Sequence, residues 1–442
     1  MGERVSVKAK VVKPRDLFAK KDSPILNRAM RAIFSDLTKA PNGQVNFPFN
    51  VINELRKEII CSRIKIKGFE DDKEILRALI IKALINLRKQ DERAIEIGRF
   101  AKELANLISQ YTSQAKKSFQ ILFPLHLAEP IQESTFNALF FGKSFKLSNW
   151  PDVESLSGWG DFIDEARTHK YGSFSYGIYV PILKQLFTPL VFSADALSSE
   201  DAFHEGNAGF EILRSLLSLQ TSFGIVTYQL GPPQPLAKFC PPPFYPIFDN
   251  SGRYLSMFYN LEPYDYAKTT VPQEFDNRLV SLCEGVSRMD PALRGIFMDS
   301  LLKYVGALDT FDWRNAFLNF WQILENLSLN TLEDGLKMSE VASRIKNLMG
   351  QAETAEKLIV DGLVATRNRL VHLGKFSKSG LKEVNYIKIV AERALSNFYV
   401  FAKDYHSRAG LMNYFADATI EDGVLRERIR NIERLLETRK KV

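Results

Sequence analysis

Cysteine and histidine are scarce in this sequence, and their scarcity excludes several kinds of site. The chain contains only three cysteines, Cys61, Cys240 and Cys283, and five histidines. The cysteines lie far apart and form no C-x-x-C pair, so their spacing supports neither a disulfide framework nor a thiolate zinc site. Few and widely spaced cysteines are typical of a reducing compartment, and we expect the chain to be cytoplasmic.

Long hydrophobic runs and glycine-rich phosphate loops are also missing. The most apolar stretch, residues 75–87, is interrupted by Arg77 and Lys82 and is too short to cross a bilayer, so we expect no membrane partner. No Walker or dinucleotide-binding glycine pattern occurs. ATP hydrolysis and NAD chemistry therefore have no support, and we expect no cofactor.

Metal-ligand patterns are weak. The acidic triplet Glu70-Asp71-Asp72 can be drawn as a metal site, but capping of the helix that follows explains it more simply. His204-Glu205 lacks the second histidine of an H-E-x-x-H motif and lies among glycines, which favours a turn or a helix cap. We predict no metal site.

Positive charge is concentrated in the first part of the chain. Residues 1–120 hold 25 of the 59 basic residues and 14 of the 52 acidic ones, whereas the remainder is slightly acidic. Such a region can attract a polyanion such as RNA. Solvated faces of amphipathic helices explain the same pattern, and both interpretations stay open.

Hydrophobic periodicity divides the chain into three parts. Residues 1–116 are basic and mainly helical, with predicted helices at about 24–37, 72–87 and 91–115. Residues 117–270 have a mixed α/β texture, with β-prone runs at 118–127, 134–141, 171–183 and 223–230 and one helix at 210–218. We predict that the proline-rich stretch 231–246 is an extended loop or a boundary, neither helix nor central strand.

Residues 271–442 are predicted to be all-helical. Helices are expected from Pro291, from Asp309 or Thr310 through Leu327, at about 341–348, 355–373 and 381–405, and around 425–436. The fold class is therefore α+β, with a mixed α/β N-terminal region followed by an all-α region. In the middle part, Tyr171, Phe174, Tyr176 and Tyr179 are difficult to bury together, and we expect a ligand surface there.

The helix at 355–373 ends in the unusual stretch ATRNRLVHLG. On a helical wheel, its buried stripe comprises Ile359, Val360, Leu363, Val364, Leu370 and Val371. Asn368 and His372 lie outside this stripe and four residues apart on one side. Arg367 falls inside the apolar arc, where an unpaired guanidinium is costly, so we expect it to meet an anion.

These residue types suit RNA cleavage without a metal ion. An imidazole can take the proton from a ribose 2′-OH or protonate the leaving 5′-oxygen, because its pKa lies near neutral pH. A guanidinium can neutralise the charge that builds on the phosphate. A single histidine is not easily both acid and base, and a symmetric dimer would supply the second copy.

The residues Arg367-Asn368-x-x-x-His372, followed by Gly374, resemble the R-N-x-x-x-H signature of HEPN domains. These are α-helical modules of bacterial toxins, abortive-infection proteins and RNA-targeting defence nucleases. The segment FLNFWQILENL, residues 317–327, is similar to the helix that precedes the motif in the Apea-like branch and that carries a glutamate, here Glu325. The resemblance covers about the last 170 residues.

The resemblance implies a HEPN helical bundle at 271–442 and a homodimer whose paired motif helices form a cleft for single-stranded RNA or tRNA. Cleavage would be independent of metal and would leave a 2′,3′-cyclic phosphate. His372 would be the acid/base group, Arg367 the phosphate ligand and Asn368 the orienting residue, with Glu325 as a partner of Arg367. Arg369 and Lys375 are further candidates for RNA binding.

The family also implies biological partners. Antiphage defence or a toxin role would require a phage-derived trigger or an antitoxin, with the N-terminal region sensing the trigger or restraining the nuclease. The alternative is a non-catalytic HEPN-fold module that binds RNA or dimerises and acts through a partner. A weaker expectation is a response to a nucleotide ligand.

Overall fold

The computed structural model describes residues 23–39, 45–46, 51–64, 73–90, 96–128, 145–171, 174–224, 235–260, 264, 266–269, 275–329, 337–350, 354–376, 380–418 and 422–440. The chain divides into two compact units, one of residues 1–117 with 195–201 and one of residues 118–194 with 202–442. The predicted strand at 134–141, most of that at 223–230 and the triplet Glu70-Asp71-Asp72 lie outside the described residues.

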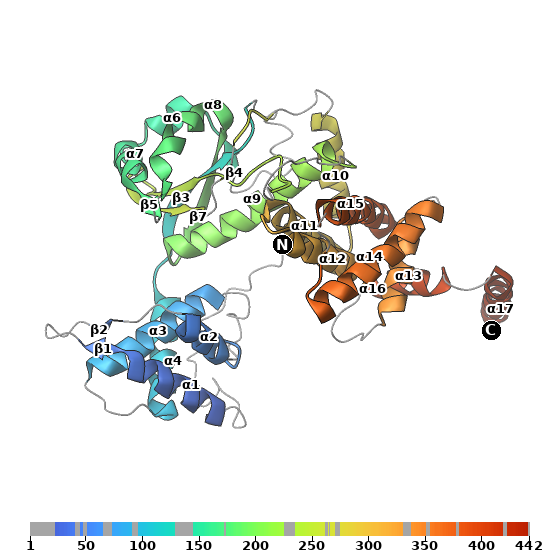
Figure 1. The fold of residues 1–442 in the computed structure, drawn as a ribbon, viewed down its shortest axis with the longest axis horizontal. Coiled ribbons are helices and arrows are strands. Elements are labelled where there is room, and N and C mark those ends of the chain that lie inside the picture. Colours follow the sequence, from blue (N-terminus) through green and yellow to red (C-terminus); the bar gives the residue numbers. More distant parts are fainter. Residues whose placement is uncertain are drawn as a thin grey trace. The chain divides into compact units, whose positions relative to one another are not determined.

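The first unit is helical in its described part, apart from a small two-stranded sheet (Figure 1). Phe100, Leu104 and Ile108 recur at helical spacing, and these three and Leu84 are fully buried in its core. The predicted helices are found as α1, α3 and α4, whereas α2 and the sheet were not predicted. The bounds are α1 (Ser23–Asp36), β1 (Thr38–Lys39), β2 (Val45–Asn46), α2 (Val51–Cys61), α3 (Lys73–Lys89) and α4 (Ile97–Ser113).

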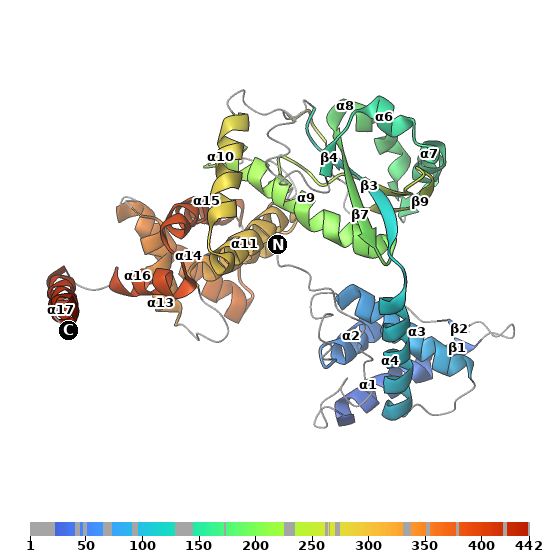
Figure 2. The same cartoon turned by 180° about the vertical axis from the view of Figure 1, so that it is seen from behind.

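The second unit begins with a five-stranded sheet in the order β4-β7-β3-β8-β9 (Figure 2). The pairs β4–β7, β3–β8 and β8–β9 are antiparallel. This sheet, followed by an all-helical region, confirms the α+β class, and β3 confirms the strand predicted at 118–127. The strands are β3 (Lys117–Leu125), β4 (Phe145–Leu147), β7 (Thr188–Ala196), β8 (Phe244–Asp249) and β9 (Tyr254–Tyr259).

Aromatic side chains cover both faces of this sheet. Phe244 and Phe248 of β8 pack against Phe162 in one core cluster, to which α6 (Trp150–Glu154) and α7 (Trp159–Thr168) contribute. Tyr245, between them in sequence, points to the opposite face and lies 6.2 Å from Phe210, ring centre to ring centre. This alternation is the one expected for a strand that is buried on both sides.

The predicted loop at 231–246 is wrong at its end. Residues 244–246 begin β8, which lies between β3 and β9 and is therefore a central strand. Pro246 pairs with Met257 of β9, but the pairing with β3 covers only residues 247–249 of β8. Pro246 thus stands just outside the paired stretch on the β3 side, where its missing N–H leaves no gap in the ladder.

The expectation of a ligand surface at residues 171–179 is also wrong for Tyr176 and Tyr179, the two tyrosines of this segment whose side chains the structure describes. Residues 170–175 form the short strands β5 (Lys170–Tyr171) and β6 (Phe174–Ser175), and the 3₁₀ helix η3 (Tyr176–Ile182) and α8 (Leu183–Leu186) follow. Tyr176 and Tyr179 are buried, and their hydroxyls donate to the carbonyls of Asn260 and Tyr264. The polar tips therefore find partners inside the core.

Helix α9 (Ser199–Thr221) is much longer than the predicted 210–218. It includes His204 and Glu205, so the prediction of a turn there is wrong. Gly206 allows the helix to lie close to the sheet. A Cβ atom at this position would lie 2.7 Å from the ring of Phe192 and 2.8 Å from that of Phe123. Close approach to the sheet requires a residue without a side chain, and packing outweighs the low helix propensity of glycine.

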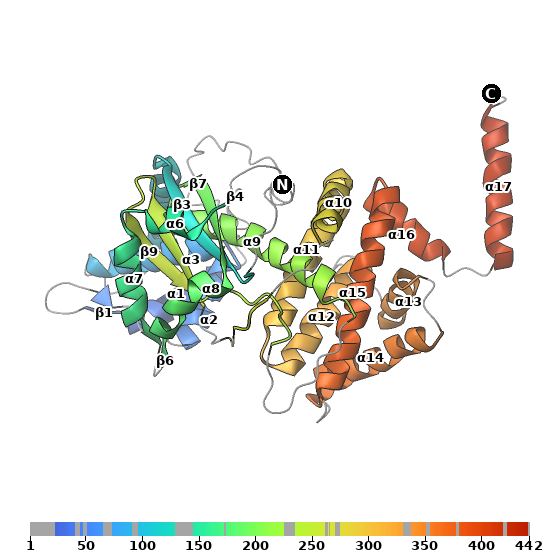
Figure 3. The ribbon, with the colours of Figure 1, turned by 90° about the horizontal axis from the view of Figure 1, so that it is seen from above.

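The rest of the second unit is helical, as predicted (Figure 3). Phe297, Phe317, Phe320 and Phe398, which were predicted to be core residues, are all fully buried. The helices are α10 (Phe275–Arg288), α11 (Pro291–Asp309), α12 (Trp313–Leu327), α13 (Met338–Leu348), α14 (Thr354–Leu373), α15 (Gly380–Asp404), α16 (Arg408–Asp417) and α17 (Asp422–Lys440).

Two helix starts show how capping sets these bounds. Asp290 accepts hydrogen bonds from the backbone N–H groups of Ala292 and Leu293, and Pro291 occupies the first turn of α11, as predicted. The predicted cap of the next helix is wrong. Asp309 is the last residue of α11, and Asp312 caps α12 through the N–H groups at positions 314 and 315.

Candidate functional site

The motif helix α14 has the predicted buried stripe except at its end. Val360, Leu363 and Leu370 are buried, and Ile359 and Val364 are half-buried. Val371 was predicted to be buried but is 49% exposed. Residues 371–375 are all exposed. The end that carries His372 is therefore accessible.

Arg367 finds the carboxylate that its position in the apolar arc requires. Its Nη2 lies 3.6 Å from Oε1 of Glu325 on α12, and both side chains are about three-quarters buried. The same Oε1 accepts a hydrogen bond of 2.7 Å from the indole Nε1 of Trp321. The predicted pairing of Arg367 with Glu325 is thus present, and it fixes the guanidinium at the junction of α12 and α14.

Asn368 and His372 lie outside this junction. The Oδ1 of the half-buried Asn368 accepts a long hydrogen bond of 3.4 Å from Nη1 of Arg367. His372 is exposed, and its imidazole makes no hydrogen bond or ion pair with any residue that the structure describes. At 100° per residue, Arg367 and His372 point about 140° apart, so one copy of α14 does not aim both at the same point.

The two further basic candidates are both exposed. Arg369 donates from Nη2 to the hydroxyl of Thr366 at 3.1 Å, which leaves most of its guanidinium directed to solvent. Lys375 follows Gly374, whose φ of +62° ends the helix. A positive φ suits glycine. Since a Cβ atom at position 374 would meet nothing within 4 Å, the backbone conformation alone explains why a glycine stands there.

Neighbouring elements hold α14 in place along its length. In its first half, Nζ of Lys346 on α13 lies 2.6 Å from the carboxylate of Asp361. After its end, the ring of Phe376 packs at 5.6 Å from that of Phe317 on α12, centre to centre. Together with the Arg367–Glu325 pair, these contacts fix the orientation of the helix, and hence the direction of its exposed face.

Small and apolar residues make up much of the exposed face of α14. Leu358 is 64% exposed and Leu373 is 63% exposed. Between them, Gly362 and Ala365 are exposed and lack any bulky side chain. Leu358, Gly362 and Ala365 follow one another at steps of four and three, and the exposed Arg369 comes next, before Leu373, on the same side of α14 as His372. Small and apolar residues of this kind allow a second helix to approach closely.

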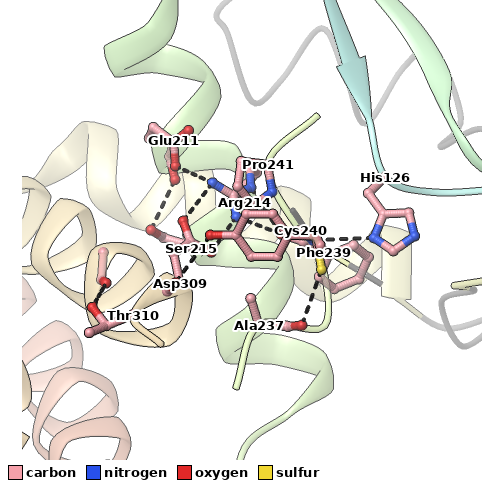
Figure 4. Close-up of polar contacts among 12 residues, drawn as sticks. His126, Glu211, Arg214, Ser215, Ala237, Phe239, Cys240, Pro241, Asp309 and Thr310 are labelled. Carbon is pink, nitrogen blue, oxygen red and sulfur yellow. Dashed lines mark hydrogen bonds and ion pairs between the residues drawn. The ribbon is translucent and has the colours of Figure 1, made fainter. Parts of the chain in front are cut away.

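Sequence reasoning missed a buried charged cluster on α9 and α11 (Figure 4). Arg214 is fully buried, and its guanidinium donates to both oxygens of Asp309, at 2.7 and 3.0 Å, and to Glu211 at 2.5 Å. Its Nε and Nη2 also donate to the carbonyl oxygen of Phe239. An arginine among the leucines of the 210–218 helix was the available signal.

Two carboxylates share one guanidinium in this cluster, and their burial changes the pKa of each. Asp309 holds Arg214 through two bonds, whereas Glu211 receives one. Burial raises the pKa of Glu211 to about 7, against the opposing effect of Arg214. Burial likewise raises the pKa of Asp309. The cluster joins the sheet-covering helix to the helical region and includes none of the motif residues.

His126 is a structural residue. Its Nε2 lies 2.8 Å from the carbonyl oxygen of Ala267, and its Nδ1 accepts from the N–H of Cys240 at 3.2 Å (Figure 4). Burial lowers the pKa of the imidazole to about 4, so the ring is neutral at physiological pH. With both nitrogens bound to backbone groups, the ring fixes the loop before β8 and is unavailable for acid/base chemistry.

A second buried network anchors the end of α9 to the helical region. Lys388 and Glu392 of α15 form an ion pair of 2.6 Å with almost no exposure. Glu392 also accepts from the hydroxyl of Tyr304 and the N–H of Gly224, and Lys388 donates to the carbonyl oxygen of Ser222. Every charge is hydrogen-bonded, as burial demands.

A cavity of about 480 Å³ opens among α9, α10, α11 and α15, away from α14. Its basic side chains are Arg278 and Lys403, and no acidic residue contributes to its lining. The ammonium of Lys403 stacks on the ring of Tyr399 at 3.9 Å. The cavity and the motif residues are therefore separate features of the helical region.

Within the described ranges, no three His, Cys, Asp or Glu side chains are grouped so that they could hold a metal ion. None of the helices in the same ranges has the length and apolar character that crossing a bilayer requires. Comparisons with protein-family models, with curated proteins and with solved structures found no match.

Proposed function

We propose that the chain is a cytoplasmic, metal-independent endoribonuclease of the HEPN type that cleaves single-stranded RNA, with tRNA as one candidate substrate. The observation that carries the proposal is the arrangement of Arg367, Asn368 and His372 on α14. The arginine is fixed by Glu325 and reaches Asn368, and the histidine is exposed and unengaged in the described structure.

The chemistry needs a base, an acid and a cation close to the scissile phosphate. His372 would take the 2′-OH proton, or protonate the leaving 5′-oxygen, and the guanidinium of Arg367 would stabilise the dianionic transition state. Asn368 would orient the phosphate or the arginine. The products would be a 2′,3′-cyclic phosphate and a 5′-OH. Arg369 and Lys375, at the exposed end of the helix, would hold the RNA backbone.

A homodimer would complete the site. One α14 presents one imidazole, and Arg367 and His372 point in different directions around its axis. Two copies paired through the face of Leu358, Gly362, Ala365 and Leu373 would supply a second imidazole. Small and apolar residues on that face support such a pairing, and Arg369 lies among them. In this proposal, the region before residue 271 senses a phage-derived trigger or restrains the nuclease, or an antitoxin does so.

The test is an RNA cleavage assay in EDTA with single-stranded RNA and tRNA. We expect wild type to cut and His372→Ala and Arg367→Ala to lose activity by about a hundredfold or more. His406→Ala, which removes another exposed histidine, and Arg288→Ala, which breaks an exposed ion pair with Glu284, are the matched controls and should cut like wild type.

A non-catalytic HEPN-fold module is the second candidate, and the exposed face of α14 favours it equally, since that face serves dimerisation whether or not RNA is cut. The same assay separates the two. If wild type and both variants leave RNA intact, with and without extract from phage-infected cells, the nuclease fails. Retention of RNA binding or dimerisation by wild type would then support the module.

A further inference from the structure

Helix α17 carries an apolar seam that nothing in the described part of the chain covers. Ile429, Ile432 and Leu436 are each 48–54% exposed, and Leu425 is half-buried. These four residues follow one another at intervals of four, three and four. At 100° per residue, they fall within an arc of roughly 60° on the helix surface.

The other positions of α17 are strongly polar. Arginine and glutamate dominate the segment 426–434, and among the α17 side chains whose exposure the structure describes, the large apolar ones that are exposed belong to the seam or are Val424. A helix of this length has little stability on its own in water and depends on packing of its apolar face. The seam therefore indicates that α17 is helical because it packs against a partner.

The spacing identifies the kind of partner. Alternating steps of three and four residues give a period of 3.5, which keeps a narrow seam in contact with another helix over two heptads. The pattern thus fits a helical partner with the same period.

Charges beside the seam fit a second copy of the same helix. Arg426 and Glu433 lie on one flank and Arg428 lies on the other. In an antiparallel pair, Arg426 faces Glu433 of the second copy twice, by symmetry. In a parallel pair, Arg428, which contacts Asp417 within its own chain, faces Glu433 of the second copy. Either direction places opposite charges across the seam.

We propose that α17 pairs with α17 of a second copy of this chain through Leu425, Ile429, Ile432 and Leu436. This surface is distinct from the face of α14 and does not depend on the nuclease. By joining two chains, it also raises the local concentration of any second, weaker contact between them.

The experiment measures the self-association of the full chain by sedimentation across a dilution series. The seam variant is Ile429→Glu with Ile432→Glu, and the matched control is Arg430→Glu with Arg434→Glu on the opposite side of α17. Both add negative charge, but only the first places it in the seam. We expect the seam variant to weaken association at least about tenfold and the control to match wild type.

To keep the α14 face from masking the result, the same comparison is made in Leu358→Glu protein. Thermal unfolding checks that all variants are folded. A wild-type chain that stays monomeric at every concentration overturns the proposal. So does a seam variant that associates like wild type, and so does one that keeps its mass while unfolding at lower temperature, since α17 would then pack on its own chain.

Discussion

Arg367 of α14 and Glu325 of α12 form an ion pair across 3.6 Å, with side-chain exposures of 23% and 25%. The carboxylate of Glu325 also accepts a hydrogen bond from the indole N–H of Trp321. This pair connects the two segments that carry the resemblance to HEPN domains, and it places the guanidinium at the edge of the core.

The pair predicts a measurable coupling energy. In a double-mutant cycle with Arg367→Met and Glu325→Gln, we expect about 0.5–1 kcal/mol from urea denaturation, because both groups are partly shielded from water. The cycle with Arg288→Met and Glu284→Gln, whose side chains are mostly exposed, should give less than about 0.5 kcal/mol. Equal coupling in the two cycles would contradict the expected effect of burial.

The Arg214 cluster predicts a pH dependence of stability. The pKa of Glu211 is about 7 in the folded chain, against an ordinary value of 4.5. The folded state therefore binds this proton more tightly than the unfolded state does. The stabilisation that results from this tighter proton binding is complete below about pH 4.5 and is lost as the pH rises through about 7. Over this range, the free energy of unfolding falls by at most about 3 kcal/mol.

The measurement compares wild type with Glu211→Gln by urea denaturation between about pH 5 and pH 8. The stability of wild type relative to this variant should fall as the pH rises. Glu284→Gln, at an exposed position of α10, should run parallel to wild type. If the stability of Glu211→Gln changed with pH in the same way as that of wild type, the carboxyl of Glu211 would not titrate in that range.

Gly206 predicts a strong effect of one methyl group. Gly206→Ala would push a Cβ into the rings of Phe192 and Phe123, and we expect a loss of about 1–3 kcal/mol of unfolding free energy. Gly295→Ala, in the interior of α11 with nothing within 4 Å, should instead stabilise the chain by about 0.4–1 kcal/mol. Chemical denaturation of both variants checks the opposite signs, and a neutral Gly206→Ala would mean that α9 can move away from the sheet.

The three cysteines predict slow thiol chemistry in the native chain. All are buried, and burial raises the pKa of Cys283 to about 12. Because the thiolate is the reactive form, we expect almost no reaction with a disulfide reagent until the chain unfolds. Ser287→Cys, at an exposed position on the same helix, should add one thiol that reacts at once. Rapid reaction of the unaltered native chain would contradict the burial of these cysteines.

Local patterns predicted the helices well because their signals are local. Asp290 and Pro291 mark the start of α11 through capping and backbone geometry, and the apolar spacing of α14 placed Leu363 and Leu370 correctly in the core. The partner of Arg367 was also predictable, since a guanidinium inside an apolar arc needs an anion. The length of α9 was not predictable, because Gly206 becomes favourable in a helix only against the sheet.

Other features depend on contacts that no local pattern encodes. Arg214 and Asp309 are 95 residues apart, and an arginine among leucines indicates a buried charge without identifying its partner. Tyr176 and Tyr179 are buried because carbonyls more than eighty residues away accept their hydroxyls. Val371 has the periodicity of a core residue, but it is 49% exposed in the last turn of α14. The roles of His372, Arg367 and Asn368 stay a prediction that rests on the motif.

The two buried networks along α9 have a consequence for dissecting the chain. A fragment that starts at residue 271 would keep Asp309, Tyr304 and Glu392 but would lose Arg214 and the backbone of residues 222–224 that satisfies Lys388 and Glu392. Asp309 would be stranded without its cation, and Glu392 and Lys388 would each lose one hydrogen bond, beside apolar surface that α9 had shielded. Any excised helical region should therefore begin before Ser199, so that α9 travels with the helices it completes.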